Sequence, residues 1–247
     1  MAGHSKFKNI QHRKGAQDKK RAKIFTRLIK QLAVAARSGT DPASNPRLRT
    51  ALAGCRAANM PKDNIERVLK RAEGGEGDQY EEIRYEGYGA GGTAFIVEAL
   101  TDNRNRTASE VRAAFSKFGG SLGETGSVSF MFDKVGQIIY PVEITNADSM
   151  FEAALDAGAQ DVETDNDTHL VTTDPEDFNA AREKLEEIFG PPEEAQLTWV
   201  AQNTLDVNED QARTLLKFID TLEDNDDVQS LSFNFQISDE ILTKLDG

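Results

Sequence analysis

The apolar residues of this 247-residue chain change their spacing at a short Gly/Glu/Asp stretch, residues 74–78. Before it they recur every three or four residues, which is the period of an α-helix. After it several segments alternate apolar and polar residues, which is the period of a β-strand. The chain is therefore expected to begin as helices and to continue as a mixed α/β structure.

Three short helices are expected before residue 74. The first begins at Arg21, has one apolar face and ends near Gly39. The second begins at Asn45-Pro46, a helix-capping residue followed by proline. The third begins at Pro61 and ends at Gly74-Gly75. The apolar face of the first helix contains Ile24, Phe25, Leu28, Ile29, Leu32 and Ala36.

The remainder reads as two interleaved α/β units. Strands at 83–87, 93–100 and 127–132 and a helix at 107–118 give the order ββαβ. Strands at 137–142, 161–164, 169–172 and 196–201, with helices at 148–157 and 175–189, give the order βαββαβ of a ferredoxin-like domain. A helix at 208–222 and a strand at 228–236 then complete the earlier unit.

The predicted fold class is α+β with three domains. A basic helical bundle with an N-terminal arm occupies residues 1–76, and a discontinuous α/β domain occupies 77–133 and 205–247. A ferredoxin-like domain is inserted at 134–204.

The net charge also differs sharply between the helical first part of the chain and the remainder. The formal net charge is -13, yet residues 1–72 contain 18 Lys and Arg against 4 Asp and Glu, whereas residues 73–247 contain 11 against 38. The first thirty residues contain ten cations and one acid, Asp18. Such a block is typical of contact with nucleic-acid phosphates. The alternative is that the basic and acidic parts neutralise each other.

Composition excludes several other classes of protein and of binding site. No apolar run approaches the roughly 18 residues of a membrane span, and no apolar signal-peptide core is evident, so a cytoplasmic protein without a membrane partner is expected. The single cysteine, Cys55, excludes an intramolecular disulfide and a multi-cysteine zinc site. Its place on an apolar helix face predicts a core residue.

Candidate nucleic-acid-binding residues cluster in the arm. His4, Phe7 and His12 are candidate base contacts, although Phe7 could instead anchor the arm on the bundle. No metal site is expected around the two histidines. Because the apolar face begins at Ile24, removal of residues 1–23 is expected to leave the folded body intact. The candidate phosphate contacts are Lys6, Lys8, Arg13, Lys14, Lys19, Lys20, Arg21 and Lys23.

Arg104 and Arg106 are expected in a loop of the acidic part. Two arginines two residues apart suit phosphates or a guanine edge. They could equally pair with nearby carboxylates or cap the helix that follows.

The chain contains short stretches that resemble enzyme or calcium-binding motifs, but each lacks a feature that its motif requires. Residues 119–123 match G-x-S-x-G, but here a helix precedes the serine and a strand follows it, the reverse of a nucleophile elbow. The glycine-rich stretch 87–92 lacks the Lys-Ser/Thr ending of a P-loop. The acidic runs 161–167 and 223–227 lack the pattern of a calcium loop and are expected at the solvated surface. We expect no enzyme, no cofactor and no small-molecule substrate.

Several segments together resemble the YebC/PmpR family, and the likeness runs nearly from end to end. They are 1–6, 12–14, 20–23, 45–49, 59–63, 85–89, 100–107 and 126–128. One departure is Ala90, where the family often has proline. The resemblance implies the three-domain organisation and a DNA-binding transcriptional regulator. Other members resemble ribosome-associated, RNA-binding translation factors, including a mitochondrial translational activator. Expected partners are therefore DNA or RNA, with the transcription machinery or the ribosome.

Overall fold

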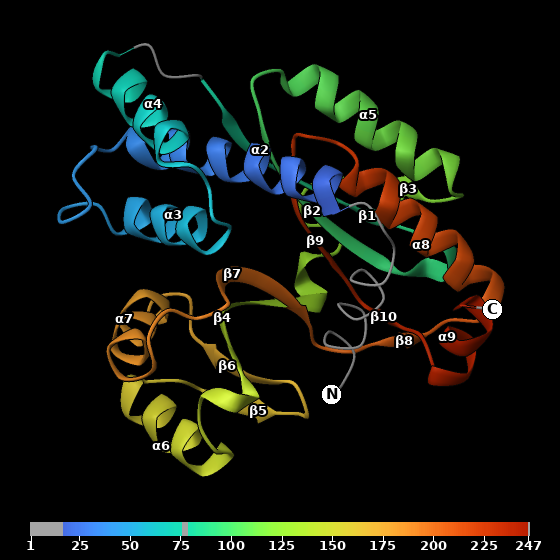
Figure 1. Ribbon diagram of the computed structural model, residues 1–247. Helices are drawn as coiled ribbons and strands as arrows, with labels where there is room; N and C mark the ends of the chain where they lie inside the picture. Colours follow the sequence, from blue (N-terminus) through green and yellow to red (C-terminus); the bar gives the residue numbers. More distant parts are fainter. Residues whose placement is uncertain (1–16, 76–78, 247) are drawn as a thin grey trace. The chain divides into compact units, whose positions relative to one another are not determined.

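The computed structural model describes residues 17–75 and 79–246, shown as coloured ribbons in Figure 1. Within these ranges the chain divides into two compact units. One contains residues 17–30, 79–132 and 201–246, and the other contains residues 31–75 and 133–200. Helices are combined with antiparallel sheets, so the predicted α+β class is confirmed. The three-domain boundaries stay a prediction.

The N-terminal helices follow the predicted order: α2 (Gln17–Ala36), α3 (Pro46–Ala57) and α4 (Lys62–Glu73). Asn45 caps α3 because its side-chain oxygen accepts a hydrogen bond from the Leu48 amide (3.0 Å). Its Nδ2 donates to the carbonyls of Ala35 and Gly39, both at 2.8 Å, and so fixes the turn between α2 and α3. Cys55 is fully buried, as predicted, and burial raises the pKa of its thiol to about 11.

The first sheet has the strand order β3-β1-β2-β9. Strand β2 (Ala94–Thr101) pairs antiparallel with β1 (Glu81–Tyr88) on one side and with β9 (Val228–Phe233) on the other. The short strand β3 (Ser121–Leu122) pairs antiparallel with the outer side of β1. Helices α5 (Arg104–Lys117) and α8 (Glu209–Glu223) pack against this sheet through one apolar core (Figure 1).

Phenylalanines fill the centre of that core. The Phe95 ring of β2 lies 4.9 Å from the Phe218 ring of α8, and Phe218 lies 4.7 Å from Phe115 of α5, both in edge-to-face geometry. These contacts join segments more than a hundred residues apart in the sequence. The predicted strand at 228–236 is divided at Asn234 into β9 and β10 (Phe235–Gln236), and β10 pairs in parallel with β8 (Leu205–Asp206). Strand β8 and helix α9 (Asp239–Asp246) were not predicted.

The predicted strand at 127–132 is wrong. This segment forms a short 3-10 helix, η2 (Ser129–Met131), and the next strand starts only at Phe132. The cause is Glu86, a buried residue of β1 whose Oε2 accepts hydrogen bonds from the amides of Val128 and Ser129, both at 2.9 Å. Amide groups bound to a carboxylate cannot join a strand ladder, so the chain turns here instead.

The second sheet has the order β5-β6-β4-β7, which is that of a ferredoxin-like domain. Its helices, α6 (Ala147–Ala157) and α7 (Phe178–Phe189), share a core with the sheet that includes Tyr140, Met150 and Leu185. A short helix, η3 (Val142–Ile144), precedes α6. The strands are β4 (Phe132–Pro141), β5 (Asp161–Thr164), β6 (Thr168–Thr173) and β7 (Glu194–Ala201).

His169 and Ser121, the serine of the G-x-S-x-G stretch, both lie on strands. His169 is fully buried on β6, where its Nδ1 lies 2.7 Å from the Thr164 hydroxyl across the strand pair and its Nε2 lies 3.0 Å from the Thr145 carbonyl oxygen. Ser121 lies on β3 after the end of α5, the predicted helix-to-strand turn. A Cβ on Gly120 would lie 2.4 Å from the Tyr88 carbonyl oxygen, so close packing explains that glycine.

Replacing Glu86 by alanine tests its structural role. Glu86→Ala leaves the buried Val128 amide and the half-buried Ser129 amide without their acceptor, so we expect the free energy of unfolding to fall by about 3 kcal/mol. Urea denaturation of the full chain measures it. Glu124→Ala, an exposed carboxylate just before the same turn, is the matched control and is expected to change stability by less than about 0.5 kcal/mol. Equal stability of the two variants would contradict this role.

Candidate nucleic-acid interface

The cations in the middle of α2 contact acidic residues of the protein itself. Lys23, Arg27 and Lys30 follow one another at steps of four and three, so they share a helix face. That face contacts the turn at residues 223–227, which joins α8 to β9. Lys23 forms an ion pair with Asp224, and the Arg27 guanidinium donates to the Glu223 carbonyl at 3.1 Å. Burial lowers the pKa of Arg27, while the charges of Glu223 and Asp226 oppose that change.

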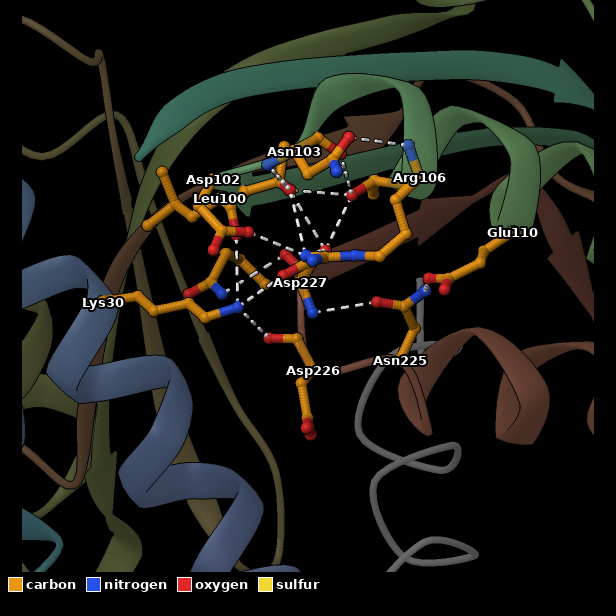
Figure 2. Close-up of polar contacts among 12 residues, drawn as sticks. Lys30, Leu100, Asp102, Asn103, Arg106, Glu110, Asn225, Asp226 and Asp227 are labelled. Atoms are coloured by element: carbon orange, nitrogen blue, oxygen red, sulfur yellow. Dashed lines mark hydrogen bonds and ion pairs between the residues drawn. The ribbon is translucent and has the colours of Figure 1, made fainter. Parts of the chain in front are cut away.

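Lys30 is the most deeply placed of the three (Figure 2). Its Nζ lies 2.6 Å from Asp227 Oδ1 and 2.9 Å from the Asp226 carbonyl oxygen, and it lies 5.4 Å from the centre of the Tyr80 ring. Only 9% of the Lys30 side chain and 6% of the Asp227 side chain are exposed. This ion pair is buried, so a charge left alone there would be strongly destabilising.

Asp227 receives further hydrogen bonds at its second oxygen. Oδ2 accepts from Arg106 (2.7 Å), from the Thr107 hydroxyl (2.7 Å) and from the Thr101 hydroxyl (3.1 Å). Burial by itself would raise the pKa of Asp227. Hydrogen bonds from Arg106, Lys30 and Thr107, with the positive charge of Lys30, outweigh burial and lower that pKa to about 2.

Arg106 lies in the first turn of α5, not in a loop, because α5 begins three residues earlier than predicted. The N-cap is Asn103, whose side-chain oxygen accepts from the Arg106 amide at 3.1 Å. The guanidinium bonds Asp227 at 2.7 Å and Asp102 at 2.9 Å, and these hydrogen bonds raise the pKa of Arg106 far above its ordinary value. Of the three interpretations open at the sequence level, pairing with carboxylates is what the structure contains. A nucleic-acid contact by Arg106 stays a prediction.

Arg104 is exposed and presents a different face of α5. Arg112, also exposed, follows it by eight residues, a net rotation of about 80°, so the two arginines lie on neighbouring strips of the helix. Both positive charges act on Tyr85 beneath the helix: burial raises the pKa of its phenol, and the two arginines oppose that change. Arg112 was missed at the sequence level, although the eight-residue spacing from Arg104 was a usable signal.

Most of the predicted arm lies outside the described residues. This applies to His4, Lys6, Phe7, Lys8, His12, Arg13 and Lys14. The backbone at Lys19, Lys20 and Arg21 belongs to α2, and Lys23 is the first arm residue whose side chain is described. Their contacts with nucleic acid stay predictions.

A groove of about 650 Å³ borders the buried pair and is lined by Thr26, Lys30, Tyr80, Arg106, Glu110 and Asn225, among others. Five carboxylates line it, against two cations, so it does not suit phosphates. Asp102, Glu110, Asp224, Asp226 and Asp227 are those acids. Among residues 17–75 and 79–246, no group of three or more His, Cys, Asp or Glu side chains is placed to hold a metal ion.

Comparison with known proteins gives the family. A family model described as the TACO1/YebC protein N-terminal domain matches residues 5–75, and one described as the TACO1/YebC second and third domain matches residues 80–235. The chain belongs to the TACO1/YebC family. The resemblance found in the sequence is thereby confirmed.

A solved structure supports the assignment. The crystal structure of a conserved hypothetical protein, Aq1575 from Aquifex aeolicus, is similar with a TM-score of 0.85 and 44% sequence identity. The match covers 94% of this chain and 97% of that one. The second of these family models is named for transcriptional regulators. The family is therefore a regulatory one and is not a known class of enzyme. Within the described ranges, no helix is both long and apolar enough to span a membrane.

Asp227→Asn tests the buried pair. It leaves the Lys30 ammonium buried without a counter-charge, so we expect the free energy of unfolding at pH 7 to fall by about 3 kcal/mol in urea denaturation. Asp224→Asn is the matched control, since this carboxylate is 74% exposed and its ion pair with Lys23 is worth less than about 1 kcal/mol. Comparable losses in both variants would contradict the assignment.

The same pair predicts a pH dependence. The pKa of Asp227 is lowered on folding, from 3.8 to about 2, so its contribution to stability is complete above pH 4. That contribution is lost as the pH falls from about 4 to about 2. Thermal unfolding between pH 2 and pH 6 should therefore show a steeper acid loss in the parent chain than in Asp227→Asn. Parallel curves would contradict the lowered pKa.

Proposed function

We propose that this TACO1/YebC protein is a DNA-binding transcriptional regulator that contacts phosphates through the basic segment before Lys23. One observation carries the proposal: the cations of α2 from Lys23 onward are paired with the protein's own acidic turn. The segment before them contains seven cations and one acid, Asp18. A protein that neutralises one set of cations internally has a separate use for the other set.

Counterion release gives this binding a measurable signature. If the seven cations each neutralise one phosphate of duplex DNA, the logarithm of the association constant falls with the logarithm of salt concentration with a slope of about -6. The acidic remainder favours the same mode, because residues 73–247 contain 27 more acids than Lys and Arg and repel phosphates. Contact is thereby confined to the basic segment and to exposed arginines such as Arg104 and Arg112.

The alternative function is a ribosome-associated, RNA-binding translation factor, and one observation favours it. The described cationic face of α2 is occupied by residues 223–227, so the part of this helix from Lys23 onward offers no free basic face to a DNA major groove. Binding that rests on phosphates and on unstacked bases near His4, Phe7 and His12 suits RNA. Either way the basic segment makes the contact.

Crosslinking separates the two functions. Ultraviolet crosslinking in living cells, followed by sequencing of the attached nucleic acid, is expected to enrich discrete promoter DNA if the protein regulates transcription. Enrichment of ribosomal or transfer RNA would instead establish the translational role. Recovery of neither above an uncrosslinked sample would contradict nucleic-acid binding altogether.

A charge variant tests the contact itself. Changing Lys6, Lys8, Arg13 and Lys14 to Gln removes four of the seven cations, so we expect the salt slope on a 20-base-pair duplex to fall from about -6 to about -3. Fluorescence anisotropy measures the slope. Lys62→Gln/Lys70→Gln, two exposed lysines of α4, is the control and should leave the slope unchanged. A slope that falls only in the control would place the interface on α4.

A further inference from the structure

Helix α6 presents an apolar stripe to solvent. Phe151 is 52% exposed and Leu155 is 62% exposed, and the four-residue step between them places them side by side on the helix. Other residues of α6, namely Met150, Ala154 and Ala157, pack in the core. Ile144 of η3, just before the helix, is also 41% exposed. These large apolar side chains therefore contribute little to the fold.

Acidic residues run beside this stripe. Asp148, Glu152 and Asp156 follow one another at steps of four on α6, and all three are exposed. Like charges at this spacing destabilise a helix, and a carboxylate in the last turn also opposes the helix dipole. Residues 141–160 contain these acids and Glu143 but no Lys, Arg or His.

No cation in the described part of the chain forms an ion pair with the three carboxylates. Lys184 of α7 reaches the end of α6, but its Nζ donates to the backbone carbonyl of Asp156 at 3.3 Å. The helix thus combines exposed apolar area with unpaired negative charge on neighbouring strips of one face. Both are unfavourable for an isolated domain, and a single partner of complementary chemistry would relieve both.

We propose that the solvent face of α6 docks a basic amphipathic helix of a partner protein. Apolar residues of that helix cover Phe151 and Leu155, and its Lys or Arg residues pair with Asp148, Glu152 and Asp156. A helix is the fitting shape because the stripe and the acids both repeat at four-residue steps, which match the ridges of a second helix. Nucleic acid is a poor occupant, since the carboxylates repel phosphates.

This docking surface goes beyond the proposed function and lies on elements that contribute none of the proposed nucleic-acid contacts. Failure of this proposal can be told apart from failure of the proposed function, because the same protein samples are also tested for binding of a 20-base-pair duplex. Loss of peptide binding with duplex binding intact concerns α6 alone. Loss of duplex binding with peptide binding intact concerns the basic segment alone.

Fluorescence anisotropy with a labelled 15-residue helical peptide tests the surface on the full chain. The peptide presents Leu at four-residue steps beside Lys at four-residue steps, and a second peptide has Glu in place of Lys. We expect saturable binding of the Lys peptide and at least tenfold weaker binding of the Glu peptide. Phe151→Ser/Leu155→Ser and Asp148→Asn/Glu152→Gln/Asp156→Asn should each weaken the Lys peptide at least tenfold. Leu205→Ser, a 42% exposed leucine of β8, is the matched control and should bind normally.

Equal affinity of the parent and Phe151→Ser/Leu155→Ser for the Lys peptide would overturn the proposal. Light scattering that shows a dimer of the parent chain, absent in that variant, would overturn it in favour of a second copy of this chain. A photocrosslinker at position 155 then identifies the occupant in cells. A crosslinked protein segment that is basic and amphipathic supports the proposal; nucleic acid, this chain itself or no crosslink contradicts it.

Discussion

One buried carboxylate, Asp227, ties together the N-terminal helix, the middle sheet and the C-terminal return of the chain. It pairs with Lys30 of α2, with Arg106 and Thr107 of α5, and with Thr101 at the end of β2. A carboxylate so placed is tolerated only when it is hydrogen-bonded, and here both of its oxygens accept hydrogen bonds. Since Asp227 immediately precedes β9, the same bonds fix the point where the C-terminal segment enters the sheet beside β2.

This arrangement divides the cations of the chain into two groups. Those from Lys23 to Lys30 hold the basic helix to the acidic turn, and they are part of the fold. Those before Lys23 are the cations that we propose for contact with phosphates. The acidic run 223–227, expected at the solvated surface, is therefore in part a structural element, since only 4% of Asp227 is exposed. Neutralisation by acidic residues therefore applies to Lys23, Arg27 and Lys30, while contact with nucleic acid stays our proposal for the cations before them.

Local patterns predicted much of this fold. Asn45-Pro46 marks the start of α3 through a cap and a proline, and the βαββαβ order follows from period and turn signals alone. Predictions failed where a distant residue decides the outcome, as at 127–132, or where a local helix cap was missed, as at the start of α5. Glu86, forty residues away, converts an alternating strand pattern at 127–132 into a turn, and Asn103 starts α5 three residues before its apolar face does.

Sequence-based prediction of the candidate site succeeded and failed for the same reasons. Clustering of cations is visible in the sequence, but their partners are not, because no local signal couples Lys30 to a residue almost two hundred positions later. Nor does periodicity tell which apolar residues face solvent. Ile24 was predicted on the inward face yet is 47% exposed, so the buried part of α2 starts later than expected. Phe151 and Leu155 have helical spacing but cover no core.

The central claim is that cations of the fold and cations of the interface are separate sets. Lysine acetylation of the full chain, read by mass spectrometry with and without bound nucleic acid, tests it directly. The account predicts that Lys6, Lys8, Lys14, Lys19 and Lys20 become protected on binding, while Lys30 is unreactive in both states and Lys62 and Lys70 react equally in both. Exposure of Lys30 on binding, or unchanged reactivity of the five N-terminal lysines, would contradict it.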